Sequence, residues 1–537
     1  MKLSHVLVIP ILTVQAVLVP FAPGKLGFLT SDTGLGVDSL GVLATSASAP
    51  SSIRRVPGQL RGVVEDSGIC ETTNGVHQAS GYVDISEDGS IWFWFFAARN
   101  NPDTAPLALW FNGGPGSSSM IGLTQENGPC RINNDSDTVS MNPYSWNERA
   151  NLLYIDQPAG VGFSTGTRVV GTSAEAARDI WTFMQIWLSD SRFSQYQNRD
   201  LAIWTESYGG HYGPSFATYF LSQNADIAAG RISGITLNLK TLAIGNGLTD
   251  PIATYQGIID YASSNPYRIF NSTALAVAND TWTRQGGCRD SINTCNDNGT
   301  DAACFHALEV CNTDVINPLL RDINVYYVPN PSTDPYPRNA TSYLNSIMST
   351  IGADVDWAMT SSFVYSNFIR TGDWMRDSSP ELENVINAGV RTLIYDGDAD
   401  LLCNYKGVEL LARLTSLDSL NTTFSDEWHQ QEFQNWTVSG QVTGLYKNAG
   451  TLSYVRVYGA GHEVPAYTYG NLSIGQAALQ MFNQIMENQS ISNNDTFGGT
   501  AVGGNGSNHD NSAQDSRISL SLASSMLIPV LAFSAFL

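Results

Sequence analysis

The chain has 537 residues, a net charge of −22 at pH 7 and an isoelectric point of about 4.5. Apolar residues make up 42% and charged residues 14%, which is typical of a globular protein with a large core and excludes a disordered tail. The acidic surface disfavours binding to nucleic acid or anionic membranes, and the length suits one large domain with an insertion, or two domains.

The N-terminal residues predict a secretory signal peptide over residues 1–22. An apolar run over residues 6–21 follows a lysine, and this run is short and interrupted by Pro10 and Pro20. These features disfavour the alternative, a membrane anchor. Residues 23–60 are rich in Gly, Ser and Pro and predict a low-complexity segment or pro-segment.

Strand-like apolar runs alternate with helical patterns through the middle of the chain. The predicted strands cover residues 91–97, 107–111, 152–155, 201–204, 242–244, 392–395 and 455–458. A helix begins after Thr172, with Glu175 in the capping-box position, and another covers residues 474–486. The runs lack strict alternation, so we expect a mostly parallel sheet with helices on both faces.

Residues 251–385 break this alternation and predict a helical insertion that caps the carboxyl edge of the sheet. Four of the seven cysteines lie there, and their spacings are not the short pairs that zinc prefers. An exported chain favours disulfides, although the sequence leaves their connectivity open. The expected pairs are Cys288–Cys311, Cys295–Cys304 and Cys70–Cys130, with Cys403 left as a buried free thiol.

Eleven Asn-x-Ser/Thr sites predict a heavily glycosylated surface. They are Asn134, Asn271, Asn279, Asn298, Asn339, Asn421, Asn435, Asn471, Asn488, Asn494 and Asn505.

Residues 491–537 predict a linker followed by the signal for a glycosylphosphatidylinositol (GPI) lipid anchor. An apolar tail over residues 520–537 follows a polar spacer and a cluster of small residues, in which Asn505 or Gly506 is the expected attachment site. Residues 511–513 are the alternative attachment site. Serines and a proline in the tail disfavour a simple membrane helix.

The segment from Thr205 to Gly210 has the context of a nucleophile elbow centred on Ser207. It follows a predicted strand and precedes a helix that we expect to begin near Tyr212. Thr205 stands where the pattern G-x-S-x-G has its first glycine, which is a departure from that pattern. The interpretation therefore depends on whether the chain also supplies a base and an acid.

Two loops after late strands supply these partners. Asp400 follows the strand at 392–395, and His462 follows the strand at 455–458, so the chain order is Ser, Asp, His, as in α/β-hydrolases. In this interpretation His462 takes the proton of Ser207, and Asp400 orients the imidazole. Asp396 and Asp398 remain alternatives for the acid, with turn formation as their simpler role.

A glycine-rich loop over residues 112–119 follows the strand at 107–111. It predicts an oxyanion hole made by the backbone N–H groups of Gly114 and Tyr208, with a simple tight turn as the alternative. A phosphate-binding loop fits poorly, because no Gly-Lys-Ser/Thr follows the glycines.

Six ordered motifs together resemble the serine carboxypeptidase family, and most closely its fungal secreted members. The motifs are WFNGGPG at 110–116, ENGP at 126–129, DQPAGVGFS at 156–164, ESYGG at 206–210, GDAD at 397–400 and GHEVP at 461–465. The resemblance implies an α/β-hydrolase fold split into residues 61–250 and 386–490 by the insertion. It agrees with Asp400 as the acid.

The resemblance also implies the substrate. In this family an Asn and two Glu residues hold the terminal carboxylate of a peptide, and here these are Asn112, Glu126 and Glu206, with the Gly113 N–H. Two carboxyls facing a carboxylate must share protons, so we expect an acid pH optimum. Glu463 beside His462 predicts a preference for a departing Lys or Arg. The substrates are peptides and proteins, with no cofactor or metal.

Two other functions remain as alternatives. The same scaffold serves esterases and acyltransferases, but the carboxylate-binding residues disfavour these activities. An inactive, anchored binding protein is the second alternative, and the departure at Thr205 is its only support.

Overall fold

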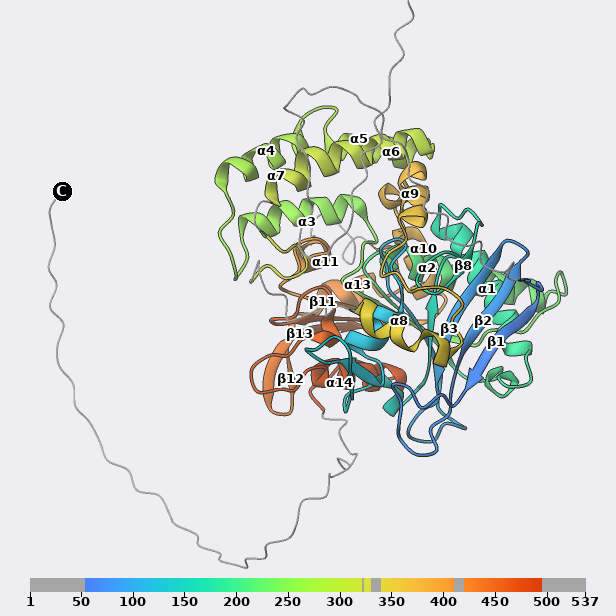
Figure 1. Ribbon diagram of the computed structural model, residues 1–537. Coiled ribbons are helices and arrows are strands. Elements are labelled where there is room, and N and C mark those ends of the chain that lie inside the picture. Colours follow the sequence, from blue (N-terminus) through green and yellow to red (C-terminus); the bar gives the residue numbers. More distant parts are fainter. Residues whose placement is uncertain (1–53, 321–322, 330–339, 410–419, 495–537) are drawn as a thin grey trace, which may run out of the picture. The chain divides into compact units, whose positions relative to one another are not determined.

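The computed structural model describes residues 54–320, 323–329, 340–409 and 420–494, and a 12-stranded sheet is its centre (Figure 1). The strand order is β1-β2-β3-β7-β4-β9-β10-β11-β14-β13-β12, with β8 beside β3. The strands are β1 (Gln59–Glu65), β2 (Gln78–Ser86), β3 (Gly89–Phe96), β4 (Leu107–Phe111), β7 (Asn151–Asp156), β8 (Thr165–Gly166), β9 (Leu201–Glu206), β10 (Leu239–Gly245), β11 (Arg391–Gly397), β12 (Gln434–Val438), β13 (Gln441–Ala449) and β14 (Leu452–Val457). A separate pair joins β5 (Cys130–Ile132) and β6 (Val139–Met141).

The central strands of the sheet are parallel and the outer strands are antiparallel. Parallel pairing runs from β7 through β4, β9, β10 and β11 to β14. The predicted α/β architecture with a mostly parallel central sheet is therefore confirmed. The carboxyl ends of these six strands meet at one edge, which is where open α/β sheets place their functional loops.

Helices cover both faces of the sheet. The helices outside the insertion are η1 (Gly122–Glu126), η2 (Trp146–Glu148), α1 (Ser173–Ser189), η3 (Ser194–Tyr196), α2 (Gly209–Ala228), α11 (Tyr405–Glu409), α13 (Ser425–Gln430), η6 (Val464–Ala466) and α14 (Gln476–Met486). Apolar side chains of α1 and α2 pack against one face in the main core. On the other face Trp204 of β9 meets Trp146 of η2 and Phe482 of α14, with ring centroids 4.6 and 5.0 Å away.

The N-terminus of α1 has the predicted cap. The Thr172 side chain accepts a hydrogen bond from the Glu175 backbone N–H at 3.2 Å. The Glu175 carboxylate accepts from the Gly171 N–H at 2.8 Å, one residue earlier than in the usual capping box.

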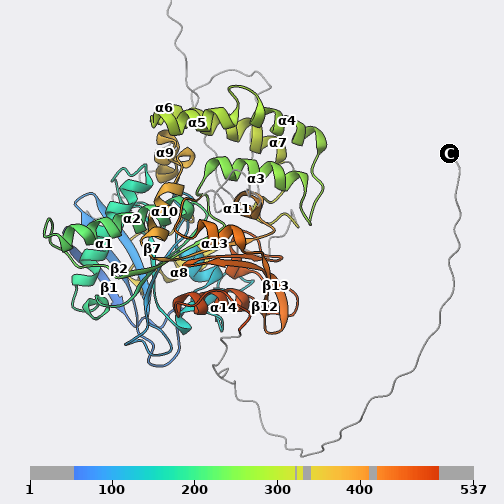
Figure 2. The same ribbon diagram turned by 180° about the vertical axis from the view of Figure 1, so that it is seen from behind.

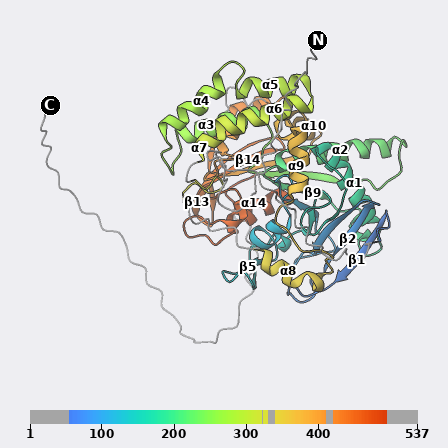
Figure 3. The same ribbon diagram turned by 45° about the horizontal axis from the view of Figure 1, so that its top comes forward.

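Between β10 and β11 the chain forms a mainly helical insertion. Its helices are α3 (Pro251–Ser263), α4 (Ser272–Thr283), α5 (Cys288–Asn298), α6 (Asp301–Cys311), η4 (Asn312–Ile316), α7 (Asn317–Leu319), α8 (Ala340–Ile351), α9 (Ser362–Thr371), η5 (Asp373–Met375) and α10 (Ser379–Asn387). Figure 1 and Figure 2 show α3 to α7 gathered above the strands, and Figure 3 shows this layer turned toward the viewer. These helices share a core with Leu401, Leu402 and Cys403, so the insertion packs on the loop that follows β11.

Three disulfides lie within the described residues. They join Cys70 to Cys130, Cys288 to Cys311 and Cys295 to Cys304, while Cys403 is a buried free thiol. The two nested bonds link α5 to α6 within the insertion, whose helices also share a buried apolar core. Nine of the predicted glycosylation asparagines lie in the described part of the chain, and all nine are exposed.

Several elements differ from the sequence prediction. The helix after Ser207 begins at Gly209 instead of near Tyr212, because the elbow turns directly into α2. Strands β1, β2, β12 and β13 were not predicted, and β14 is not preceded by a helix but by the β12–β13 hairpin. In β13 buried and partly exposed positions mix along a polar sequence, which hides the strand from a search for apolar runs.

Some predictions fall outside the described residues. These are the signal peptide, most of the segment at 23–60, the glycosylation sites Asn339 and Asn505, and the anchor signal with its attachment site at Asn505 or Gly506. Within the described residues, no helix combines the length and the hydropathy needed to cross a membrane.

Candidate active site

Ser207 lies on a strained turn between β9 and α2. Its φ of +65° is in the left-handed region, which is uncommon for a residue other than glycine. The turn is held by hydrogen bonds from Ser207 N to Gly245 O (3.0 Å) and from Leu248 N to Ser207 O (2.9 Å). This geometry matches the predicted nucleophile elbow and leaves the side chain half-buried at the carboxyl edge of the sheet.

Thr205, the departure from the G-x-S-x-G pattern, fits this elbow. Its hydroxyl donates to Gly209 O at 3.0 Å, and the residue is fully buried. A Cβ on Gly209 would lie 2.4 Å from the Thr205 Cβ, so glycine at 209 makes room for the threonine. The threonine at position 205 therefore does not support the alternative of an inactive binding protein.

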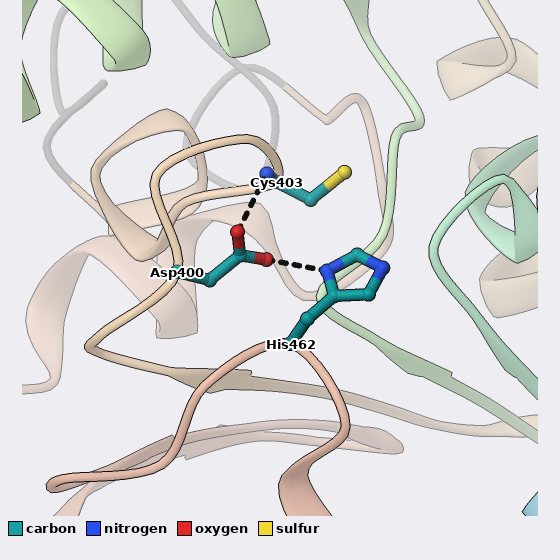
Figure 4. A group of neighbouring side chains, drawn as sticks. All are labelled: Asp400, Cys403 and His462. Atoms are coloured by element: carbon teal, nitrogen blue, oxygen red, sulfur yellow. Dashed lines mark hydrogen bonds and ion pairs between the residues drawn. The ribbon is translucent and has the colours of Figure 1, made fainter. Parts of the chain in front are cut away.

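Asp400 and His462 are in direct contact. The His462 Nδ1 lies 2.6 Å from Asp400 Oδ2, and both side chains are at most 8% exposed (Figure 4). The second ring nitrogen, Nε2, points away from Asp400. Because Nδ1–H donates to the carboxylate, Nε2 is left as the basic nitrogen.

The two alternative carboxylates are engaged elsewhere. Asp398 accepts from Gly459 N at 2.7 Å and from the Tyr267 hydroxyl. Asp396 accepts from the Tyr454 hydroxyl at 3.1 Å. Neither has a hydrogen bond to His462 in the described part of the chain, so Asp400 is the one of these three carboxylates that contacts the imidazole.

The three predicted residues follow neighbouring parallel strands. Ser207 follows β9, Asp400 follows β11 and His462 comes after β14, with only β10 between the first two strands. Among the described contacts there is no hydrogen bond between the Ser207 hydroxyl and His462. Such bonds are often long in unliganded sites and shorten when substrate binds.

The glycine loop after β4 lies against the elbow. A Cβ on Gly113 would be 2.3 Å from Tyr208 N and 2.6 Å from Glu206 O, so only glycine allows this approach. In the described residues no acceptor binds the backbone N–H groups of Gly113, Gly114 or Tyr208. These donors beside Ser207 fit the predicted oxyanion hole.

Asn112, Glu126 and Glu206 form one buried polar cluster beside this loop. The Asn112 Nδ2 donates to Glu126 Oε1 at 3.0 Å and to Glu206 Oε1 at 3.1 Å. The other oxygen of each glutamate is buried without a hydrogen-bond partner in the described structure. Two buried carboxyl oxygens with unused hydrogen-bonding capacity at one place are typical of a site that binds a polar group.

Burial raises the pKa of both glutamates. For Glu206 the pKa lies well above its usual range, because burial is reinforced by the charges of Glu126 and Glu463. For Glu126 the pKa is also raised by burial, while hydrogen bonds with the Glu206 carboxyl and the Asn112 amide act in the opposite direction. The pair therefore retains a proton under conditions in which an exposed carboxyl would lose it.

Other residues hold this cluster and were missed from the sequence. The Asn112 Oδ1 accepts from Trp110 Nε1 (2.8 Å) and Gly122 N (2.9 Å), which fixes the amide orientation. The Arg131 Nη2 donates to Glu126 O (2.7 Å) and to Pro465 O (3.2 Å), and thereby links the cluster to the loop after His462. Nothing in the local sequence around Arg131 indicates this role.

Tyr326 is a second residue that the sequence did not indicate. Its carbonyl accepts from His462 N at 3.0 Å, and its ring lies 4.9 Å from the imidazole. The residue belongs to the insertion and is distant in sequence from the His462 loop that it contacts.

The grouping of Asp400, Cys403 and His462 resembles a metal site in composition only. Their potential ligand atoms lie within 4.8 Å of one another. However, the Asp400 oxygens already accept hydrogen bonds from His462, Leu402 N and Asn246. Burial raises the pKa of the Cys403 thiol well above its usual range, so the thiolate that a metal needs is disfavoured.

Comparisons with known proteins agree with this geometry. The sequence profile of the serine carboxypeptidase family matches residues 69–488. Carboxypeptidase S1 of Penicillium janthinellum is 41% identical over 435 residues, which cover 80% of this chain and 99% of that protein. Carboxypeptidase Y of Schizosaccharomyces pombe is 34% identical over 431 residues, which cover 77% of this chain and 41% of that protein.

A solved structure supports the fold. The crystal structure of a prohormone-processing carboxypeptidase from Saccharomyces cerevisiae superposes with a TM-score of 0.62 at 24% identity, over 77% of this chain and 91% of that one. The chain belongs to the serine carboxypeptidase family and is a serine-type carboxypeptidase, which releases C-terminal residues from peptides.

Proposed function

We propose that Ser207, His462 and Asp400 carry out this hydrolysis through an acyl-enzyme intermediate. The observation that carries the proposal is the 2.6 Å contact between His462 Nδ1 and Asp400 at the same sheet edge as the strained Ser207 turn. His462 Nε2 takes the Ser207 proton as the hydroxyl oxygen attacks the last peptide carbonyl. The same nitrogen then gives that proton to the departing amino group, and a water molecule later releases the acyl group.

The N–H groups of Gly114 and Tyr208 are proposed to stabilise the negative oxygen of the tetrahedral intermediate. Tyr208 N and the Ser207 Cβ lie 2.3 and 2.8 Å from the position that a Cβ on Gly113 would take, and Gly114 is the next residue of this glycine loop. Donors that are fixed before the reaction lower the barrier without a cost of reorganisation.

The buried cluster is proposed to bind the terminal carboxylate of the substrate. The Gly113 N–H donates to that carboxylate, and so does an Asn112 N–H once it is released from one of the two glutamates that it binds. The protonated carboxyls of Glu126 and Glu206 donate through the oxygens that have no partner. This arrangement limits cleavage to the last residue, because an internal peptide bond has no carboxylate at that distance.

The same cluster supports an acid pH optimum. The pKa of Glu206 is raised by burial and by its acidic neighbours, so its proton is present in acid and is lost as the pH rises through that raised value. Once the proton is lost, a buried carboxylate faces the substrate carboxylate and repels it. Binding is therefore strong at low pH and weakens toward alkaline pH, which raises KM.

We expect Glu206→Gln to extend activity toward higher pH. The amide donates at every pH, so the rise of KM with pH should move upward by about one pH unit or more. The measurement is kcat/KM for a blocked dipeptide with a free carboxylate as a function of pH.

The matched control for this experiment is Glu381→Gln. Burial also raises the pKa of Glu381, to about 7, but this residue lies on α10, away from the cluster. Its substitution should leave the pH profile unchanged. An identical profile for wild type and Glu206→Gln would reject the role of Glu206.

Glu463 is proposed to favour Lys or Arg as the departing residue. It follows His462 directly, and its charge contributes to the raised pKa of Glu206, which supports the proposal that it lies close to the carboxylate-binding cluster. An electrostatic pair in a partly exposed site contributes about 1 kcal/mol or less, which corresponds to about fivefold in kcat/KM.

We therefore expect Glu463→Gln to reduce the preference for peptides ending in Lys over those ending in Leu by about fivefold. Both peptides are compared at acid pH, where Glu206 keeps its proton in parent and variant. An equal Lys-to-Leu ratio in the two proteins would rule out this role.

Secretion and attachment through a lipid anchor are also proposed. The apolar runs at the two ends of the chain, the three disulfides and the nine exposed glycosylation sequences support export.

A further inference from the structure

Asn246 lies at the end of β10, between the strand that leads to Ser207 and the strand that leads to Asp400. It is fully buried, and its φ of +38° is in the left-handed region that Asn tolerates better than most residues. Its backbone N–H donates to Tyr395 O at 2.9 Å, which fixes the residue against β11.

The Asn246 side chain binds the loop that carries the acid. Its Nδ2 donates to Asp400 Oδ2 at 3.1 Å and to Cys403 O at 3.0 Å, while its Oδ1 accepts from Gly397 N at 2.9 Å. The Asn246 amide therefore binds the chain at Gly397, at Asp400 and at Cys403.

Asp400 Oδ2 accepts hydrogen bonds from His462 and from Asn246. Its Oδ1 accepts from the backbone N–H groups of Leu402 (2.8 Å) and Cys403 (3.4 Å). Asn246 and His462 therefore supply the two side-chain donors to this buried carboxylate. Loss of the amide would leave Oδ2 with the His462 hydrogen bond alone, so that only the backbone bonds to Oδ1 would oppose a tilt of the carboxylate away from the imidazole.

The turn that contains Asn246 also holds the nucleophile. Gly245 O accepts from Ser207 N, and Leu248 N donates to Ser207 O, as described above. One short turn after β10 thus contacts Ser207 through its backbone and Asp400 through the Asn246 side chain.

We propose that Asn246 is a positioning residue that fixes Asp400 in register with His462 and Ser207. This inference rests on the proposed roles of those three residues. Asn246 does not touch the substrate. It acts by setting the orientation of the carboxylate that orients the imidazole.

The test is Asn246→Asp, which keeps the shape, the tolerance for positive φ and the acceptor for Gly397 N. It places a second carboxyl about 3 Å from Asp400, and two such groups share one proton. We expect kcat for a blocked dipeptide to fall by about 10- to 100-fold, with KM within about twofold because the carboxylate-binding cluster is untouched.

The matched control is Asn404→Asp. Asn404 is also buried and lies in the same loop, where it donates to Leu401 O (3.1 Å) and accepts from Gly407 N (2.9 Å) without contacting Asp400. We expect this variant to lower the melting temperature but not kcat. Equal losses of kcat in the two variants would overturn the inference, as would an unchanged kcat in Asn246→Asp.

A double-mutant cycle separates positioning from a general structural effect. In an Asp400→Asn background, Asn246→Asp should cause little further loss of kcat, whereas additive losses would contradict action through Asp400. Asn246→Gly, which also tolerates positive φ, replaces Asn246→Asp if that variant does not fold. Ser207→Ala separates a failure of the proposed function from a failure of this inference. If Ser207→Ala keeps its activity, the proposed function is wrong. If Ser207→Ala is inactive but Asn246→Asp has the kcat of wild type, only the role of Asn246 is rejected.

Discussion

Ser207→Ala is expected to lower kcat by about five to six orders of magnitude while KM changes little. The substitution removes the attacking oxygen, but it leaves the carboxylate-binding cluster and the backbone donors of Gly114 and Tyr208 in place. The residual rate comes from those donors and from substrate positioning. The measurement is hydrolysis of a blocked dipeptide at acid pH, with thermal unfolding as the check on folding.

Ser215→Ala provides the matched control for this experiment. Ser215 is buried on α2 and lies close in sequence to the elbow. Its loss should leave kcat within about twofold of wild type, because it contributes no atom to the site. If Ser207→Ala retained activity within tenfold, the assignment of the nucleophile would be wrong.

Asp400→Asn is expected to lower kcat by about four orders of magnitude. The amide oxygen is expected to accept the N–H groups of Leu402 and Cys403, so that the NH2 group faces His462 and donates to Nδ1. The imidazole then loses the tautomer that leaves Nε2 basic. The stabilisation of the positive imidazolium is lost as well. KM should stay near the wild-type value, because Asp400 lies away from the cluster of Asn112, Glu126 and Glu206.

The comparison with Asp396→Asn and Asp398→Asn makes this test specific. Asp396 binds the Tyr454 hydroxyl, and Asp398 binds Tyr267 and Gly459 N. Their loss should destabilise the loops after β11 and β14 without removing the partner of His462. A larger fall in kcat for either variant than for Asp400→Asn would transfer the role of the acid to that residue.

The central strands were predictable because their physical signal is local. Residues 107–111 form β4 as predicted, and the other central strands differ from the prediction by a few residues at their ends. Strands buried on both faces are continuously apolar, which a single sequence displays directly. The order of Ser207, Asp400 and His462 after such strands was enough to predict that Asp400 and His462 meet.

The outer strands were not predictable in the same way. In β13 only some positions are buried, and Lys447 and Asn448 interrupt any apolar pattern. Such a strand is stabilised by pairing with β12 and β14, which are contacts that its own sequence does not display.

The supporting residues of the site were also hidden from sequence analysis. Asn246, Arg131 and Tyr326 contact the site from segments far away along the chain. A buried Asn or a loop Arg has many ordinary roles, and only the folded backbone shows which groups it faces. The roles of Asn112, Glu126 and Glu206 depended on a family resemblance, and the structure adds that their side chains form one hydrogen-bonded cluster.

The most direct test of the central claim is labelling with a serine-reactive phosphonate, followed by mass spectrometry of the digested protein. We predict one adduct per molecule, located on Ser207, with hydrolysis of C-terminal residues lost in proportion to labelling. In His462→Ala the adduct should form far more slowly, because the base that activates the hydroxyl is gone. An adduct on another serine, or peptide hydrolysis that persists after complete labelling of Ser207, would contradict the account.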